Sequence, residues 1–321
     1  MFKYTLKKIL SSIIVLFGIS IVIFTLVHLQ PGNPYITMID PSVSPEILKE
    51  MLTKIGYYDP IHIKYIKWLT RCLQGDFGYS IYYSKPVLSV ISTRMYNTII
   101  LGVFALIISL ILGVTIGIFS AIKKNTMFDY TVTVFSFIGV SIPAFFFGLI
   151  LIKVFSFDLN IFPTSGMSTL GADYTGISAL LDVLHHMVLP GLVLALLQCT
   201  AFIRYTRSAM IEVLDKEYLV TARAKGLTKI QAIFKHGFKN ALIPIVTVIF
   251  LQIPFLFSGA LLTETVFVWP GIGRLSYEAV LNRDYPLIMG ILMILSIIIL
   301  LSNLIADILY AIIDPRIKYD S

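Results

Sequence analysis

Charged residues are scarce in this sequence. Asp, Glu, Lys and Arg make up 13% of its 321 residues, whereas 57% of the residues are hydrophobic. The mean hydropathy is strongly positive as a result. A chain of this composition carries too much apolar surface for a single water-soluble core. The composition therefore predicts an integral membrane protein.

Residues that carry chemistry are also few. The two cysteines, Cys72 and Cys199, fall in a predicted external loop and in an apolar helix, so no disulfide between them is expected. The five histidines lie on segments that do not converge, and no Cys or carboxylate spacing completes a metal site. We expect no metal, no cofactor and no catalytic set in this chain.

Two further absences exclude whole classes of function. The sequence has no G-x-x-x-x-G-K-[ST] phosphate loop, and Gly271-Ile272-Gly273 lacks both a third glycine and a preceding strand. The chain is therefore not expected to be an ATPase or another enzyme. Its net charge of +7 is not concentrated in a patch interleaved with aromatic residues, which argues against nucleic-acid binding.

Six apolar segments are long enough to cross a bilayer, because about 20 residues at 1.5 Å each span roughly 30 Å. They are residues 9–29, 98–122, 130–155, 187–205, 244–268 and 286–310. The first follows Lys3, Lys7 and Lys8 and imitates a signal peptide. It is 21 residues long, however, and no small-x-small cleavage site follows it, so we expect a retained helix.

The basic residues predict the topology. An even number of spans places both termini on one side, and the segments on that side carry fifteen Lys and Arg against nine on the other. We therefore expect an all-α membrane protein with six transmembrane helices and cytoplasmic termini. Its parts are a first helix (1–29), a folded extracytoplasmic loop (30–96), a five-helix core (97–310) with a cytoplasmic loop (207–243) that carries a helix between spans four and five, and a cytoplasmic tail (311–321).

The outer loops show signs of order. Residues 45–55 and 61–73 favour short helices, and in the second of these Ile63, Ile66, Trp68 and Leu69 could line one face. Residues 75–80 and 160–166 have the composition of rigid turns. Because the long loop keeps its aliphatic and aromatic residues, we expect it to fold rather than to be disordered.

Small residues mark close approach or bending within the spans. Gly113 and Gly117 form a small-xxx-small face in the second span. Ser141-Ile142-Pro143 interrupts the third span, where Pro143 removes a helical hydrogen bond and should kink the helix. Ordinary packing within one subunit is the simpler interpretation of both, and a part in shaping a pathway is the alternative.

Three ionisable groups fall inside the predicted spans. Lys153 and Asp307 lie near span ends, where their side chains can reach the headgroups. Glu264 lies shortly before Trp269-Pro270-Gly271, where the helix must break, and it either faces a polar cavity or caps the turn. No series of carboxylates crosses the bilayer, which argues against a proton-coupled pump.

A polar island, residues 215–244, interrupts the apolar pattern between spans four and five. Residues 207–225 are rich in helix formers, and Gly226 stands where a helix needs a residue that tolerates positive φ to end. Thr228 and Gln231 have the spacing of a capping box that opens a second helix. The island therefore predicts helix, turn, helix, which either docks on a partner or lies on anionic lipid.

The island resembles the cytoplasmic coupling loop, or EAA motif, of permease subunits of bacterial ABC importers of the dipeptide, oligopeptide and nickel group. The matching residues are Tyr218, Thr221-Ala222-Arg223-Ala224-Lys225-Gly226-Leu227 and Asn240-Ala241-Leu242-Ile243-Pro244. Further matches are Pro31-Gly32, residues 75–80, Ser141-Ile142-Pro143 with Phe145 and Gly148, residues 162–166, residues 264–275 and Asp314-Pro315-Arg316. The chain is most similar to the first permease subunit, which has a long outer loop after its first helix. One departure is Val220, which occupies the position of the motif's Glu.

This resemblance implies a partner set and a mechanism. A second homologous permease subunit would complete the pathway, two ATP-binding-cassette ATPase subunits would bind ATP and Mg, and an extracytoplasmic binding protein would deliver substrate. The setting would be the bacterial inner (cytoplasmic) membrane, as a multi-pass protein in contact with lipid. ATP-driven closure of the ATPases would pull on the coupling loop and rock the bundle from inward-facing to outward-facing.

The resemblance also implies site residues and a cargo. The residues expected to couple to the ATPase are Glu217, Tyr218, Thr221, Ala222, Arg223, Ala224, Lys225, Gly226 and Leu227. Those expected at the pathway or its gate are Ser141, Pro143, Glu264, Pro270 and Gly271. The expected cargo is a di- or oligopeptide, with nickel or a metal chelate as the alternative. A self-sufficient secondary transporter is a further hypothesis. It would require internal inverted symmetry or a relay of buried ionisable groups, and the sequence shows neither.

Overall fold

The computed structural model describes residues 2–30, 44–54, 56–258 and 260–313, so Pro31-Gly32 and Asp314-Pro315-Arg316 lie outside the described residues. Within the described ranges the regular structure is helical, apart from one isolated bridge between Tyr79 and Pro86. The chain divides into two compact units. The first unit contains Asn97–Arg274 and the chain from Ser302 onward, and the second contains Phe2–Tyr96 and Leu275–Leu301.

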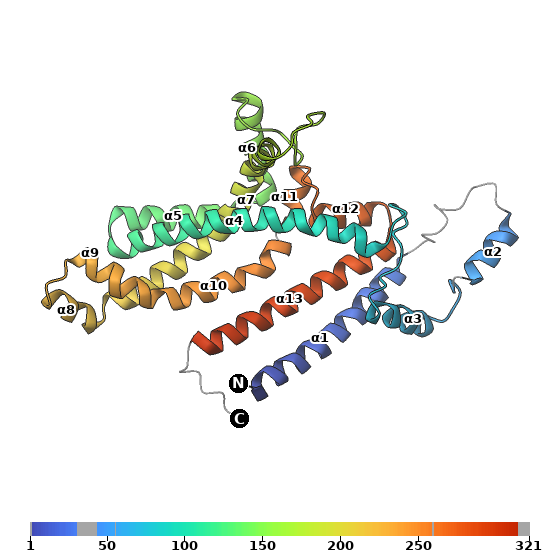
Figure 1. Ribbon diagram of the computed structural model, residues 1–321, viewed down its shortest axis with the longest axis horizontal. Helices are drawn as coiled ribbons and strands as arrows, with labels where there is room; N and C mark the ends of the chain where they lie inside the picture. Colours follow the sequence, from blue (N-terminus) through green and yellow to red (C-terminus); the bar gives the residue numbers. More distant parts are fainter. Residues whose placement is uncertain (1, 31–43, 55, 259, 314–321) are drawn as a thin grey trace. The chain divides into compact units, whose positions relative to one another are not determined.

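Helices follow one another along the described chain, with longer connections between α3 and α4 and between η2 and α7 (Figure 1). In order they are α1 (Phe2–His28), α2 (Pro45–Lys54), α3 (Ile61–Leu73), α4 (Val87–Ile122), α5 (Met127–Ser141), α6 (Ala144–Leu151), the π-helix η2 (Ile152–Asp158), α7 (Ile177–Leu214), α8 (Glu217–Ala224), α9 (Lys229–Ala232), the π-helix η3 (Ile233–Phe238), α10 (Lys239–Ser258), α11 (Ala260–Val266), α12 (Ile272–Leu281) and α13 (Tyr285–Ile313).

Four of these helices, α1, α4, α7 and α13, are long and apolar enough to cross a membrane. Two bent pairs of helices pass the same test together, which gives up to six spans among the described residues if each pair is counted as one. The four long helices contain the first, second, fourth and sixth predicted segments. Both short helices predicted in the long outer loop are confirmed as α2 and α3.

Helix α4 begins eleven residues before the predicted start of the second span. Its first turns are not lipid-facing, because Val87 and Ile91 are buried within the second unit. Both pack on Gly290, where an added Cβ would come within 3.5 Å of Ile91 and closer still to Val87. Hydropathy alone locates the apolar core of a span and misses helical turns that are buried against protein.

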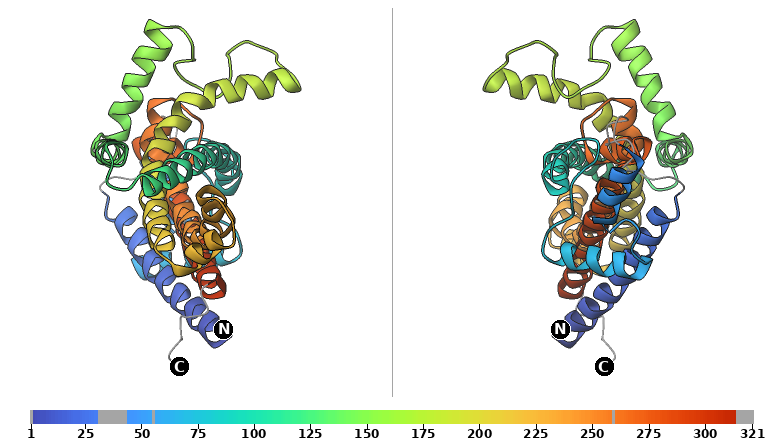
Figure 2. Two further views of the ribbon diagram at one scale, coloured as in Figure 1. Left: turned by 90° about the vertical axis from the view of Figure 1, so that its left-hand side faces the viewer. Right: turned by 90° about the vertical axis from the view of Figure 1, so that its right-hand side faces the viewer.

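The third predicted span is broken rather than kinked. Helix α5 ends at Ser141, Ile142 has extended backbone (φ −79, ψ 125), and α6 leaves at an angle of 100° (Figure 2). Proline disfavours helical geometry at the residue before it, so Ile142 stays extended and Pro143 opens a new helix. The new helix packs on α11, where Gly148 leaves 3.1 Å between an added Cβ and the ring of Phe267.

Gly113 and Gly117 of the second span pack against α7 within the subunit, which agrees with the simpler of the two interpretations. A Cβ added at Gly113 would lie 2.5 Å from the Cβ of Phe202, and one at Gly117 would lie 2.7 Å from that of Thr206. Both neighbours belong to α7. The backbones of α4 and α7 therefore approach as closely as glycine permits.

A bidentate ion pair ties α5 to α7 in the first unit. Arg207 Nε and Nη2 donate to the two carboxylate oxygens of Asp129 at 2.7 and 2.8 Å. Asp129 is 2% exposed and also accepts hydrogen bonds from the Ser120 hydroxyl and the Asn125 backbone N–H. With four donors around it, the carboxylate is buried at little cost, and it joins the α4–α5 turn to α7.

A second buried carboxylate organises the second unit. Asp284 is fully buried and caps α13 by accepting from the Leu287 backbone N–H at 3.2 Å. It also accepts from the Ser80 hydroxyl and, at 3.0 Å, from the Tyr82 backbone N–H. The predicted turn at residues 75–80 is confirmed, with positive φ at its two glycines, and Asp284 holds it against the start of α13.

Tyr83 adds a second tie in the same unit. Its hydroxyl donates to the Glu278 carboxylate at 2.7 Å. Burial, followed by the hydrogen bond to Glu278, raises the pKa of Tyr83 to about 12. The phenol is therefore neutral, and able to donate, at every physiological pH.

Helix α3 packs on α1 through Tyr65 and Trp68, whereas Ile66 is 58% exposed and Ile63 is 38% exposed. Trp68 therefore does not share a face with Ile63 and Ile66, as the sequence analysis suggested that it could. Helical periodicity identifies candidate faces but not which face meets a neighbour.

Replacing Asp284 by Ala should destabilise the protein by about 2–4 kcal/mol, because it removes a helix cap and leaves buried donors on Ser80 and Tyr82 unpaired. Thermal unfolding of the purified chain in detergent measures this loss. The matched control is Asp173→Ala at an exposed loop position, which should change the unfolding midpoint very little. Equal midpoints for the two variants would contradict the role assigned to Asp284.

The ion pair makes an asymmetric prediction. Arg207→Ala should cost about 2–3 kcal/mol, because it leaves a buried carboxylate uncompensated, and Asp129→Asn should cost less, because the guanidinium is 30% exposed and can be hydrated. Denaturant titration of both variants compares the two costs. Arg204→Ala, one turn earlier and exposed, is the control. A larger loss for Asp129→Asn than for Arg207→Ala would show that the pair is misassigned.

Candidate functional site

The predicted polar island forms a compact loop at one end of α4, α7 and α10 (Figure 1). Helix α7 ends at Leu214, and α8 begins after Asp215 and the extended residue Lys216. The expected uninterrupted helix over 207–225 is therefore wrong. If α7 continued, its buried face would next present polar residues, Glu217 and Thr221, at helical spacing from Met210 and Val213. The break turns apolar side chains inward instead.

Leu219 and Ala222 are the side chains of α8 that the break turns inward. They are 5% and 8% exposed. They belong to a buried cluster with residues of α4, α7, α9, η3 and α10, namely Ile118, Ala121, Ala209, Met210, Val213, Ala232, Ile233 and Ala241. Helix α8 is thus fixed to the bundle by one of its faces. The structure places Ala222 on that inner face, so its small side chain permits packing within the chain.

The end of α8 is confirmed as predicted. Gly226 has φ +94, and its N–H bonds to the Arg223 carbonyl at 3.0 Å while the Leu227 N–H bonds to the Ala222 carbonyl at 3.3 Å. These two bonds form a Schellman motif, which satisfies the last carbonyls of the helix. No atom lies within 4 Å of a Cβ added at Gly226, so glycine is needed there for its backbone and not for space.

The next helix is also confirmed at its start. Thr228 accepts from the Gln231 backbone N–H, and the Gln231 side chain accepts from the Thr228 backbone N–H, which completes the capping box. Leu227, between the two caps, packs against the buried cluster. The turn between α8 and α9 is therefore held by local bonds on both sides.

The outer face of α8 remains exposed in the described structure. Val220 is 68% exposed and Tyr218 is 38% exposed. The Tyr218 hydroxyl accepts a hydrogen bond from Asn240 Nδ2 at 3.1 Å, which ties α8 to the start of α10. The other exposed residues expected to couple to a partner are Glu217, Thr221, Arg223, Ala224, Lys225 and Gly226. The outward side of α8 thus carries Val220 with two charged neighbours, Glu217 and Arg223, whereas Tyr218 lies on the side toward α10.

The residues expected at the pathway or gate fall at two helix breaks. Ser141 and Pro143 flank the 100° break between α5 and α6. Pro270 and Gly271 lie between α11 and α12, where the Pro270 carbonyl accepts from Asn97 Nδ2 at 2.8 Å. Helix α6 packs on α11, so the two breaks belong to one packed region of the first unit.

Glu264 is fully buried at the second of these breaks. It accepts a hydrogen bond from the Thr98 hydroxyl at 2.7 Å and from the Arg274 backbone N–H, in the first turn of α12, at 3.1 Å. Its carboxylate therefore caps α12, one of the two roles considered for this residue. A Cβ added at Gly271 would overlap the Glu264 carboxylate, so the close approach requires glycine.

Sequence analysis missed Asp129 and Arg207. Arg207 was counted among the basic residues that set the topology, and Asp129 lies just before the predicted third span. The available signal was an acidic residue, Asp129, directly before one apolar segment, and an Arg just after the end of another apolar segment. Pairing them needs the three-dimensional neighbourhood of α5 and α7, which the sequence does not supply.

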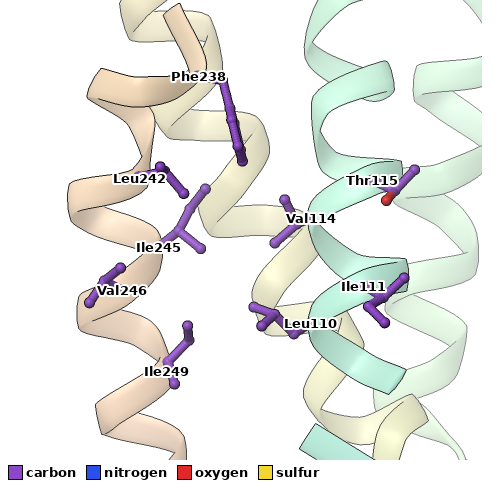
Figure 3. A pocket seen from close by; sticks show the side chains of 9 residues that line it. All are labelled: Leu110, Ile111, Val114, Thr115, Phe238, Leu242, Ile245, Val246 and Ile249. Carbon is purple, nitrogen blue, oxygen red and sulfur yellow. The ribbon is translucent and has the colours of Figure 1, made fainter. Parts of the chain in front are cut away.

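An apolar pocket of about 330 Å³ lies between α4 and α10 (Figure 3). Its lining residues are Leu110, Ile111, Val114, Thr115, Phe238, Leu242, Ile245, Val246 and Ile249. Thr115 is the one polar side chain among them. Val114 and Phe238 also pack against the cluster beneath α8, so the pocket adjoins the coupling loop. Its walls carry no charge with which to recognise the ends of a peptide.

Comparisons with known proteins cover the whole chain. Residues 113–319 match the family described as "Binding-protein-dependent transport system inner membrane component", and residues 1–102 match its N-terminal companion, "Binding-prot-dependent transport system membrane comp, N-term". The chain is 42% identical over 320 residues to the oligopeptide transport system permease protein AppB of Bacillus subtilis (strain 168), covering 99% of this chain and 100% of that one.

Two further relatives have comparable coverage. The dipeptide transport system permease protein DppB of Alkalihalophilus pseudofirmus is 39% identical over 333 residues. The glutathione transport system permease protein GsiC of Salmonella paratyphi A is 36% identical over 319 residues. Each match covers 99% of this chain and 100% of the relative.

The fold is also found among solved structures. An inward-facing form of the MetNI methionine ABC transporter matches with a TM-score of 0.56 and 16% identity, over 71% of this chain and 97% of that one. Together with the apolar helices, these matches confirm the resemblance drawn from the sequence and describe a multi-pass protein of the bacterial inner membrane. The chain belongs to the binding-protein-dependent transport system inner membrane component family, as a membrane permease of an ABC importer.

Proposed function

We propose that this permease imports peptides, as one of two homologous subunits that enclose a shared pathway. The printed names of its relatives support this cargo, since those at 42% and 39% identity are oligopeptide and dipeptide permeases along their whole length. An extracytoplasmic binding protein delivers the peptide, in keeping with the family's description as binding-protein-dependent.

The proposed topology has six spans with both termini in the cytoplasm. Four long apolar helices and two bent pairs support the number of spans. The excess of Lys and Arg in the segments assigned to the inside supports the orientation. In this orientation the outer face of α8 is presented to the cytoplasm, and residues 30–96 lie outside the cell.

Energy comes from two separate ATP-binding-cassette subunits, which bind ATP and Mg. The sequence itself has no phosphate-binding loop, so the chain needs a mechanical connection to a partner that does. Helix α8 is suited to be that connection because one face is buried in its own bundle and the other is exposed. This two-faced burial is the observation that carries the proposal.

The contact with the ATPase rests mainly on shape. Val220 replaces the motif's Glu and is 68% exposed, while Tyr218 is 38% exposed on the side of α8 toward α10. Fully burying a valine contributes about 1.5–3 kcal/mol, enough for such residues to dominate a small contact. Arg223 and Lys225 at the edge contribute orientation more than affinity.

The pathway residues act through helix geometry. Ser141, Pro143, Pro270 and Gly271 lie at breaks, and Glu264 fixes the start of α12 rather than reaching into open space. Breaks at the membrane midplane let backbone and side chains line a cavity, as in other transporters. We therefore place the gate in the packed region formed by α6 and α11.

Val220→Asp should abolish coupling, because it places a charge at the centre of an apolar contact. We expect at least a tenfold loss of ATPase binding, and a matching loss of transport, when the chain is co-expressed with its second permease and ATPase subunits. Co-purification of the ATPase and peptide uptake in vesicles measure the two effects.

The matched control for this variant is Ile230→Asp. Ile230 is 69% exposed, almost the same as Val220, and lies on α9 in the same loop. It should leave ATPase binding near the wild-type value. Equal behaviour of the two variants, whether both active or both inactive, would show that the outer face of α8 is not the coupling contact.

A further inference from the structure

Helix α3 has three distinct faces, and its own chain covers one of them. Tyr65 and Trp68 lie on that covered face. The Tyr65 hydroxyl is 2.8 Å from Ser20 Oγ of α1, and the Trp68 ring is 5.5 Å from that of Phe24. Cys72, one turn further along, shares this face, and burial raises the pKa of its thiol to about 11.

The second face is apolar and uncovered in the described structure. Ile63, Ile66 and Leu73 are 38%, 58% and 80% exposed. Their spacing of three and seven residues places them on one side of the helix. Three large aliphatic side chains on one side of a short helix need an apolar environment beyond the described part of the chain.

The third face is basic. Lys64, Lys67 and Arg71 follow one another at spacings of three and four residues. Lys67 pairs with Asp59 at 2.6 Å, and the Lys64 ammonium lies 5.0 Å from the centre of the Tyr57 ring. After the Asp59 pair is set aside, Lys64 and Arg71 leave this face with a positive charge.

The contacts with α1 fix the depth of α3 in the bilayer. Helix α1 is apolar enough to cross a membrane from Thr5 to His28. Ser20 and Phe24, which α3 contacts, precede His28 by eight and four residues, or about 12 and 6 Å at 1.5 Å per residue. Interfacial helices bury their apolar face about 5–10 Å into the boundary between headgroups and acyl chains. Helix α3 therefore lies at the level of that boundary.

The residues around α3 suit this level. Tyr65 and Trp68 lie against Phe24 of α1, and Tyr57, whose ring lies edge to face with that of Tyr58, contacts Lys64 of α3. Tyr and Trp are enriched where a membrane meets water, because one end of each ring is apolar and the other polar.

We propose that α3 is an interfacial helix that binds the lipid surface. Its apolar face inserts among acyl chains at the His28 end of α1, and its basic face contacts the phosphates of anionic phospholipids. The apolar side chains, the positive charge and the depth set by α1 all favour lipid as the partner of α3. The inference goes beyond the proposed function, and it depends on α1 crossing the membrane but not on the cargo or on coupling by α8.

Site-directed spin labelling tests the apolar face. In a Cys72→Ser, Cys199→Ser background, a label is introduced at Ile66→Cys, Leu73→Cys or Arg71→Cys, and the full chain with its partner subunits is placed in nanodiscs of phosphatidylcholine with phosphatidylglycerol. We expect labels at 66 and 73 to be relaxed several-fold more by oxygen, which concentrates in the acyl region, than by a water-soluble nickel chelate. The label at 71 should show the opposite preference.

Two results would overturn the proposal. If labels at 66 and 73 are as accessible to the nickel chelate as the label at 71, the apolar face lies in water. If they are shielded from both reagents, a protein covers the face instead of lipid. Retained transport by the labelled complexes shows that the measurement reports the assembled permease.

A second measurement tests the headgroup. Quenching of a fluorophore at Leu73→Cys is compared for doxyl-labelled phosphatidylglycerol and doxyl-labelled phosphatidylcholine. A basic group near an anionic surface is worth about 1 kcal/mol, so Lys64→Gln and Arg71→Gln should each lower the local preference for phosphatidylglycerol by roughly fivefold. Lys49→Gln with Lys85→Gln, at exposed positions outside α3, is the control and should keep the preference. Equal quenching by the two lipids in the wild-type chain would refute the phosphate contact.

Discussion

The burial of Leu219 and Ala222 is the contact on which the exposed face of α8 depends. A helix as short as α8 is not stable by itself in water, so it persists because tertiary packing fixes it. That packing involves α4, α7, α9, η3 and α10 at once. The outer face of α8 is therefore attached to several helices and not to a flexible loop.

Buried carboxylates fix helix ends elsewhere in the chain. Asp129, Glu264 and Asp284 are each almost inaccessible to solvent, and each stands at or near a helix end. There, backbone N–H groups are available as donors, and each of the three carboxylates accepts a hydrogen bond from at least one of them. These residues join helix ends and leave the apolar middle of the spans free of charge.

Local chemistry was the part of this protein that the sequence predicted well. The end of α8 at Gly226 and the capping box of Thr228 and Gln231 follow from residues within a few positions of one another, and both are confirmed. The break before α8 was missed, because helix formers surround Asp215 and Lys216. The reason for the break is the burial of Leu219 in a cluster that includes residues far away in the sequence. Local propensity yields when tertiary burial favours another path.

Faces were harder to predict than elements. Helix α3 was expected at the residues where it occurs, yet the face suggested for it combined Trp68, which contacts α1, with Ile66, which is exposed. Ala222 was likewise expected to meet a partner and instead packs inside the chain. The role of Glu264 could not be assigned from the sequence. It accepts hydrogen bonds from Thr98 and Arg274, and Thr98 lies far away in the sequence. Periodicity defines which residues share a face of a helix, whereas the element that packs against each face depends on the whole fold.

The contact of Gly113 and Gly117 with α7 sets the separation of two long helices. An added Cβ at either position would overlap Phe202 or Thr206, so α4 and α7 lie closer together than any larger residue would allow. A side chain at either position would therefore have to push the two helices apart along their contact.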